Sequence, residues 1–418
     1  MKVKKFLRNP YNFILANMFI FFAFAFIVDT PRDIWDGLIR IVLSQDVLIT
    51  DYFYIGGVGA TLVNAGLTGV IAVTLFKIFK VQPSGMGILA VWMIPGYAFF
   101  GKNIANIWPI ILGGYLYSLY QRKPYRDFII VIFLSTTLAP AITQVTFFSE
   151  STIIGVIFAL ILGILIGFII HPLSMFTLRA HARYNLYNVG FSAGLVSLFL
   201  AAIFRNRGHD IGPLARWSTE YNTISLIFIL TLCLVSIIGG LWLSYDKSFL
   251  KEFSIKEYIK DCKLIEDKYM KYGPRTYINT GVIGIIGVAA VYALGGQLNG
   301  PILGGVFTII AFACLGKNPY NMLPLMIGLN LAVLIHGWDL SDNRTVMATT
   351  LVTSLAPIPS RLGPIWGVAA GMLHLNIIVQ LAQMNAGLSL YNNGLAAGLV
   401  AIVIVPIVFA IRRKGEVT

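Results

Sequence analysis

Long runs of apolar residues alternate with short polar segments along almost the whole chain. A membrane-spanning helix needs about 20 mostly apolar residues, because the hydrocarbon layer is about 30 Å thick and a helix rises 1.5 Å per residue. Runs of roughly this length lie near residues 12–28, 57–79, 83–101, 104–120, 127–146, 151–171, 186–204, 222–244, 276–295, 298–316, 319–337, 344–359, 362–384 and 392–411. Several are short or interrupted by glycine and proline, which leaves re-entrant hairpins open for them. The pattern predicts an all-α polytopic membrane protein.

The composition points the same way. Of the 418 residues, 57% are hydrophobic and 12% are charged, and the mean hydropathy is +0.79. A soluble domain carries about 25% charged residues, so an ordinary soluble enzyme is excluded. The formal net charge of +13 would suggest nucleic acid in a soluble protein. Here the basic residues flank apolar runs, so we expect a lipid bilayer as partner and no nucleic acid.

The distribution of basic residues predicts an orientation. If the N-terminus lies in the cytoplasm and all fourteen runs cross, 24 of the 31 lysines and arginines fall on the cytoplasmic side. Cytoplasmic loops of membrane proteins carry this excess. We therefore expect a multi-pass plasma-membrane protein with both termini in the cytoplasm.

The second half of the chain repeats the first. Shifted by 215 positions, residues 61–120 and 276–335 share 19 identities in 60 positions. Shared Asn, Gln, Lys and Pro cannot come from hydropathy alone. With a smaller shift, Leu-Tyr-Asn at 186–188 matches the same three residues at 390–392. The sequence therefore predicts an internal duplication.

The number of runs in each half sets the expected relation between the copies. Each half holds seven, and tandem copies with an odd number of crossings insert with opposite orientation. We expect a first transmembrane repeat over 1–208 and a second, inverted repeat over 209–418. Residues 246–275 of the second repeat are rich in lysine and predict a cytoplasmic amphipathic segment.

The charged groups that ion-coupled pumps use are not found inside the runs. None of the 18 carboxylates lies in the middle of an apolar run. Coupled transporters usually carry their ion on an intramembrane Asp or Glu, so we expect passive or weakly coupled transport. No His/Cys/Asp/Glu spacing suggests a metal site, and we expect neither a metal nor a cofactor.

The polar residues within the runs are neutral and occur in pairs. Asn64 and Asn279 stand early in corresponding runs, and Asn188 and Asn392 form a second pair. A buried amide without a partner costs several kcal/mol, so each must face a neighbouring helix or a watery path. Hydrogen bonding between helices and lining of a path both stay open.

Two interrupted segments at corresponding places are the best pointer to a transport site. Hydroxyls precede a proline in both, as Thr136, Thr137 and Pro140 in the first half and Thr353, Ser354 and Pro357 in the second. Proline frees a backbone carbonyl, and freed backbone at membrane depth is tolerated where it lines a cavity. Arg361 follows the second segment, either as a charge at the cytoplasmic edge or as an anion-binding residue in the path.

Two Gly-Lys-Asn corners form the last pair. Inverted symmetry places Lys102 and Asn103 near one face of the membrane, and Lys317 and Asn318 near the other. The glycine ends the preceding helix, and lysine is favourable at that negative end of the helix dipole. Capping and attraction of a solute at two pore mouths both stay open.

Short motifs resemble the urea-transporter superfamily. Residues 185–190 read Asn-Leu-Tyr-Asn-Val-Gly, and residues 64–67 read Asn-Ala-Gly-Leu. They are similar to that superfamily's Leu-Tyr-Gly-x-Asn-Gly helix starts and to its Asn-Pro-x-x-Gly-Leu segment. The resemblance implies inverted repeats around a central polar pore. The whole chain also resembles a bacterial family of multi-pass membrane proteins known only as a domain of unknown function, which implies no activity.

These observations favour a bacterial plasma-membrane transporter or channel for a small polar solute, and not an enzyme. The expected path lies at the interface of the repeats, and a homo-oligomer is left open. One alternative is a membrane-embedded enzyme acting on a lipid or isoprenoid phosphate. Another is a flavin-holding subunit of a redox complex.

Overall fold

The computed structural model describes residues 2–45, 50–209, 216–245, 261, 263–390 and 392–415. Within these ranges the chain is helical and contains no β-strand. Most of the predicted amphipathic segment 246–275 lies outside the described residues. Its described part holds the short helices α14 (Lys268–Tyr272) and η3 (Gly273–Arg275).

The helices follow the apolar runs closely. In the first half they are α1 (Lys2–Leu7), α2 (Pro10–Val28), α3 (Pro31–Leu43), α4 (Tyr52–Gly56), α5 (Val58–Ile78), α6 (Gly85–Tyr97), α7 (Trp108–Tyr120), η1 (Tyr125–Asp127), α8 (Ile129–Ser135), η2 (Thr136–Leu138), α9 (Ala139–Thr146), α10 (Thr152–Ala180) and α11 (Asn188–Asn206). In the second half they are α12 (Asn222–Ser244), α15 (Thr276–Ala293), α16 (Gly300–Phe312), η4 (Ala313–Leu315), α17 (Pro319–Ile335), α18 (Asn343–Leu351), η5 (Val352–Leu355), α19 (Pro357–Leu362), α20 (Pro364–Met384) and α21 (Asn392–Gly415).

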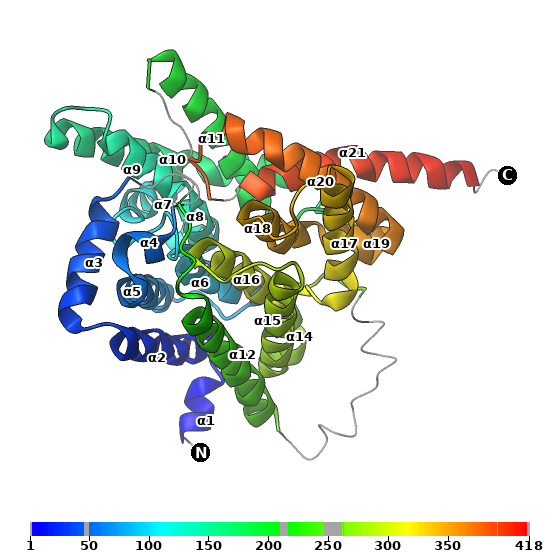
Figure 1. Ribbon diagram of the computed structural model, residues 1–418, viewed down its shortest axis with the longest axis horizontal. Helices are drawn as coiled ribbons and strands as arrows, with labels where there is room; N and C mark the ends of the chain where they lie inside the picture. The colour runs from blue at the N-terminus through cyan, green and yellow to red at the C-terminus, as the bar shows by residue number, and fades with distance from the viewer. Residues whose placement is uncertain are drawn as a thin grey trace.

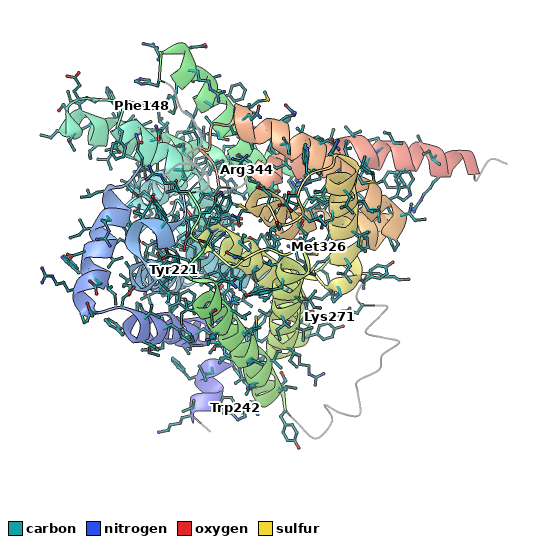
Figure 2. All side chains as sticks on the ribbon, viewed as in Figure 1. Phe148, Tyr221, Trp242, Lys271, Met326 and Arg344 are labelled. Atoms are coloured by element: carbon teal, nitrogen blue, oxygen red, sulfur yellow. The ribbon has the colours of Figure 1, made fainter. Side chains whose placement is uncertain are left out.

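The helices are those of a membrane-embedded protein. Among the described residues, nine helical segments are long and apolar enough to cross a bilayer. Large apolar side chains are exposed along them; Ile153 on α10 and Ile365 on α20 are 74% and 82% exposed. Figure 2 shows Tyr221 at the inner end of α12 and Trp242 at its outer end. Lipid is the solvent that accommodates so much exposed apolar surface.

Two short helices meet in the middle of the molecule. Figure 1 shows α6 and α16 near its centre, with α2 and α3 on one side and α17 and α20 on the other. Each has 13 residues, or roughly 20 Å of helix, which is less than the hydrocarbon thickness. Gly304 of α16 lies against Phe100 and against the backbone oxygen of Gly96 on α6. Both helices are shorter than the candidate spans, and re-entrant hairpins at these runs stay a prediction.

Corresponding helices pack in the same way in each half. α2 packs against α5 as α12 packs against α15, and α7 packs against α10 as α17 packs against α20. Gly167 touches the carbonyl oxygen of Ile110, and Gly371 touches that of Leu325. A side chain at either glycine would meet backbone, so close contact of the two helices requires glycine there.

Each half also supplies a carboxylate to the central short helix of the other half. Asp51 Oδ1 accepts hydrogen bonds from the N–H of Phe53 (2.9 Å) and from the N–H of Gly300 (3.2 Å), where α16 begins. Asp267 Oδ2 accepts one from the N–H of Gly85 (2.8 Å), where α6 begins. Carboxylates satisfy the free N–H groups of a helix start and interact favourably with its dipole. The two halves therefore hold each other's short helices in place.

Candidate functional site

The two proline-containing segments break as their sequences predict. Between α8 and α9 the chain makes the single turn η2, and between α18 and α19 it makes η5. Pro140 and Pro357 stand in the first turn of the helices that follow, where no N–H is needed. Thr136, Thr137, Thr353 and Ser354 are at most 1% exposed. The hydroxyl-bearing turns are therefore buried in the protein.

The two breaks are each tied to the start of a helix in the opposite half. The N–H of Leu186, before α11, donates to the carbonyl oxygen of Ser354 over 2.9 Å. The N–H of Leu390, before α21, donates to the carbonyl oxygen of Thr137 over 3.0 Å. These carbonyls, freed at the breaks, thus connect the halves in a reciprocal pair.

The helices α11 and α21 cross where their first turns meet. A Cβ atom on Gly394 would lie 2.6 Å from the carbonyl carbon of Gly190. The Asn185 side chain donates to the carbonyl oxygen of Gly394 over 2.8 Å. The crossing therefore depends on two glycines that allow the backbones to touch.

Asn64 and Asn279 hold the chain where it leaves the short central helices. Asn64 Nδ2 donates to the carbonyl oxygens of Ala98 (2.9 Å) and Lys102 (3.0 Å). Asn279 Nδ2 donates to those of Ala313 (3.4 Å) and Lys317 (2.9 Å). Both amides satisfy carbonyls that a broken helix leaves free, which is the hydrogen-bonding alternative left open above. A role in lining a path stays a prediction.

The lysines of the Gly-Lys-Asn corners lie in the interior. Lys102 is 1% exposed and Lys317 is 0% exposed. Lys317 Nζ donates to the hydroxyl oxygens of Tyr187 (2.8 Å) and Thr353 (2.9 Å). It also lies 4.9 Å from the ring centroids of Tyr187 and Phe312. The lysine thus joins a short central helix, a break and a helix start in one cluster.

The asparagines of these corners form hydrogen bonds within the turns. The N–H of Asn103 donates to Oδ1 of Asn106 over 2.9 Å, and the N–H of Asn318 donates to Oδ1 of Asn321 over 3.0 Å. Asn318 also caps the start of α17 through the N–H of Tyr320. Both corners are therefore rigid turns, and their position at a pore mouth stays a prediction.

Asn188, Asn392 and Arg361 have partners outside this cluster. Asn188 is held by hydrogen bonds with Thr177 and His181, and Asn392 accepts one from Asn385 over 2.7 Å. Arg361 is exposed, and its guanidinium carbon lies 5.1 Å from the ring centroid of Tyr184. Exposure of Arg361 favours the interpretation as an edge charge.

A family comparison accounts for most of the chain. A family model described as a protein of unknown function, DUF1576, matches residues 30–206 and residues 250–410. The chain belongs to this family. The resemblance to a domain of unknown function is thereby confirmed, and the two DUF1576 ranges fall one in each half. No curated protein and no solved structure matches the chain. The resemblance to urea transporters stays a prediction.

Sequence reasoning missed several buried hydroxyl-bearing residues of this DUF1576 chain. Tyr187 was part of a recurring motif, but its hydroxyl contact with Lys317 spans 130 positions. Tyr97 and Thr308, whose hydroxyl oxygens lie 3.3 Å apart, join α6 to α16. Only the recurrence of Leu-Tyr-Asn could have drawn attention to Tyr187. Among the described residues, no three His, Cys, Asp or Glu side chains gather as metal ligands would.

A charged clamp lies beside the Lys317 corner. Lys268 and Lys271 each form ion pairs with Asp261 and Glu266, at 2.7–3.0 Å. Lys268 also lies against Gly316; Figure 2 labels Lys271 at the edge of the molecule. The clamp fastens α14 near this corner.

We expect acid to release the clamp. Hydrogen bonds from the lysines hold the pKa of Glu266 below its usual range; burial raises the pKa of Asp261, but the same bonds outweigh burial and lower it. A carboxyl group whose pKa is lower in the folded than in the unfolded protein stabilises the fold at pH values above its unfolded pKa of about 4. This stabilisation is lost as the pH falls through the pKa of the folded state. The difference in thermal unfolding temperature between the wild type and Asp261→Asn should therefore shrink from pH 6 to pH 3. A constant difference would contradict this.

Proposed function

We propose that this protein is a transporter or channel for a small polar solute in the bacterial plasma membrane. Its path runs along the interface of two inverted repeats. The observation that carries the proposal is the reciprocal pair of hydrogen bonds from Leu186 to Ser354 and from Leu390 to Thr137. Paired broken helices at the contact between repeats are the usual location of a transport site.

The recurrence of contacts between the halves supports the inverted arrangement. Asp51 of the first half caps α16 of the second half, and Asp267 of the second half caps α6 of the first. The broken segment of each half likewise accepts a backbone hydrogen bond from the other half. A pseudo-two-fold axis relates partners that are exchanged in this way, and the axis lies in the membrane plane when each half crosses an odd number of times. From the excess of basic residues on one side, we infer that both termini lie in the cytoplasm.

We expect the purified protein to carry small polar solutes across proteoliposome membranes. The panel comprises urea, glycerol, formate and nitrate, with protein-free liposomes as the blank. Thr137→Val keeps the shape of the side chain and removes its hydroxyl, so flux of the transported solute should fall several-fold. The matched control is Thr231→Val, whose hydroxyl bonds within α12 to Ile227 on the outer surface. Flux at the blank level from a folded, monodisperse protein would refute the proposal.

Passive transport is part of the proposal. It is supported by the sequence, in which no carboxylate stands in the middle of an apolar run. Hydroxyl and carbonyl oxygens can also bind a coupling ion, so ion coupling is tested by measuring flux. Solute should equilibrate and not accumulate when a proton or sodium gradient is imposed on the proteoliposomes. Uphill accumulation driven by either gradient would overturn this part.

A further inference from the structure

The Lys317 ammonium group has hydroxyl neighbours and no opposite charge. Its hydrogen-bond partners are the hydroxyls of Tyr187 and Thr353, and its aromatic neighbours are the rings of Tyr187 and Phe312. No carboxylate in the described part of the chain forms an ion pair with it. A buried charge without a counter-ion is costly, and aromatic faces offset only part of the cost. Burial without a counter-ion disfavours the ammonium form of Lys317, so its positive charge is stable only together with an anion.

Two buried hydroxyls at corresponding positions lack partners. Thr137 Oγ1 and Ser354 Oγ have no hydrogen-bond partner among the residues that the structure describes. Their neighbours behave differently: Thr136 bonds to the carbonyl oxygen of Phe133, and Thr353 to that of Thr350. Leaving a buried hydroxyl without a hydrogen-bond partner destabilises a protein. Both breaks keep one such hydroxyl.

The free hydroxyl and the hydroxyl that binds Lys317 belong to consecutive residues of the same break. Ser354 follows Thr353, which accepts a hydrogen bond from Lys317. The backbone oxygen of Ser354 accepts a hydrogen bond from the N–H of Leu186, the residue before Tyr187. An ammonium and a hydroxyl donor together satisfy an anion through charge-assisted hydrogen bonds. A neutral solute would leave the charge unbalanced, and a cation would add to it.

We propose that the transported solute is a small monovalent anion, bound on its way by the Lys317 ammonium and the Ser354 hydroxyl. Thr137 and Lys102 provide the corresponding groups in the other half. One ammonium per cluster matches a single negative charge. The inference rests on the proposed transport function and adds the class of solute to it.

The test compares anions with neutral solutes in the same proteoliposomes. Formate and nitrate should cross the membrane, at least tenfold faster than urea and glycerol. Lys317→Met should lower anion flux at least tenfold, and Lys317→Arg should keep more of it because the charge remains. Ser354→Ala should lower anion flux several-fold without affecting folding, since its hydroxyl has no partner to lose. The control is Ser197→Ala, a buried serine whose hydroxyl bonds within α11 to Gly194; it should leave flux unchanged.

The outcomes separate the inference from the proposed function. Flux of urea or glycerol without anion flux would overturn the anion inference and support transport. Flux of no solute would overturn both. Anion flux that stays at the wild-type level in Ser354→Ala and in Thr137→Ala would overturn the binding role of the hydroxyls, even if Lys317→Met does not fold. Anion-dependent thermal stabilisation of the detergent-solubilised protein, lost in Ser354→Ala, gives a second readout.

Discussion

Replacing Asp51 with alanine is expected to lower the thermal unfolding temperature in detergent by more than 5 °C. The carboxylate is 0% exposed and accepts hydrogen bonds from the N–H groups of Phe53, Ser218 (2.9 Å) and Gly300. Each buried N–H that loses its acceptor costs about 1–3 kcal/mol, so the loss is at least about 3 kcal/mol. Differential scanning fluorimetry of the purified variant measures it.

The control for this prediction is a carboxylate on the same segment between α2 and α5. Asp36 is about half exposed and forms an ion pair with Arg32 at 4.0 Å. Exposed pairs contribute about 0–1 kcal/mol, so Asp36→Ala should unfold within 2 °C of the wild type. Asp51→Asn keeps one oxygen and should fall between the two. An Asp51→Ala protein as stable as Asp36→Ala would show that the cap between the halves is not needed.

Gly394→Ala is expected to destabilise the protein by about 1–3 kcal/mol or more. The added Cβ would lie 2.6 Å from the carbonyl carbon and 2.7 Å from the Cα of Gly190. Backbone cannot move aside as a side chain can, so α11 and α21 must separate, and overpacking of this kind costs 1–3 kcal/mol or more. The measurement is the unfolding temperature together with the monodisperse yield on size-exclusion chromatography.

The matched control for Gly394→Ala is Gly287→Ala, in α15. Its nearest neighbour would be the tip of the flexible Ile309 side chain at 3.0 Å, and alanine favours a helix over glycine by about 1 kcal/mol. We expect it to unfold within 2 °C of the wild type. Equal effects of Gly394→Ala and Gly287→Ala would mean that the backbone contact at the crossing is unimportant.

The helices could be predicted because lipid removes the alternatives. In a bilayer every backbone group must be satisfied within its own segment, so an apolar run becomes a helix. The run predicted at 222–244 coincides with α12 (Asn222–Ser244). The breaks were predictable for a local reason as well, because Pro140 and Pro357 cannot continue the preceding helices.

The contacts that assemble the site were beyond the sequence pattern. Asp51 and Asp267 look like ordinary loop carboxylates, because the N–H groups that they cap lie 249 and 182 positions away. Tyr187 looks like any aromatic residue in an apolar run until Lys317 is placed beside it. Periodicity predicts which face of a helix is buried, but pairing between distant segments depends on packing that it does not encode.

The exchange of caps between halves has a consequence for synthesis on the ribosome. α6 is made long before its partner, since Asp267 follows Gly85 by 182 positions. At about 5–20 residues per second, translation reaches this carboxylate roughly 10–40 s later. During that interval the N–H group at the start of α6 lies inside or beside the bilayer without the carboxylate of Asp267 as its acceptor. It must be shielded by lipid headgroups, water or the insertion machinery until the second half arrives.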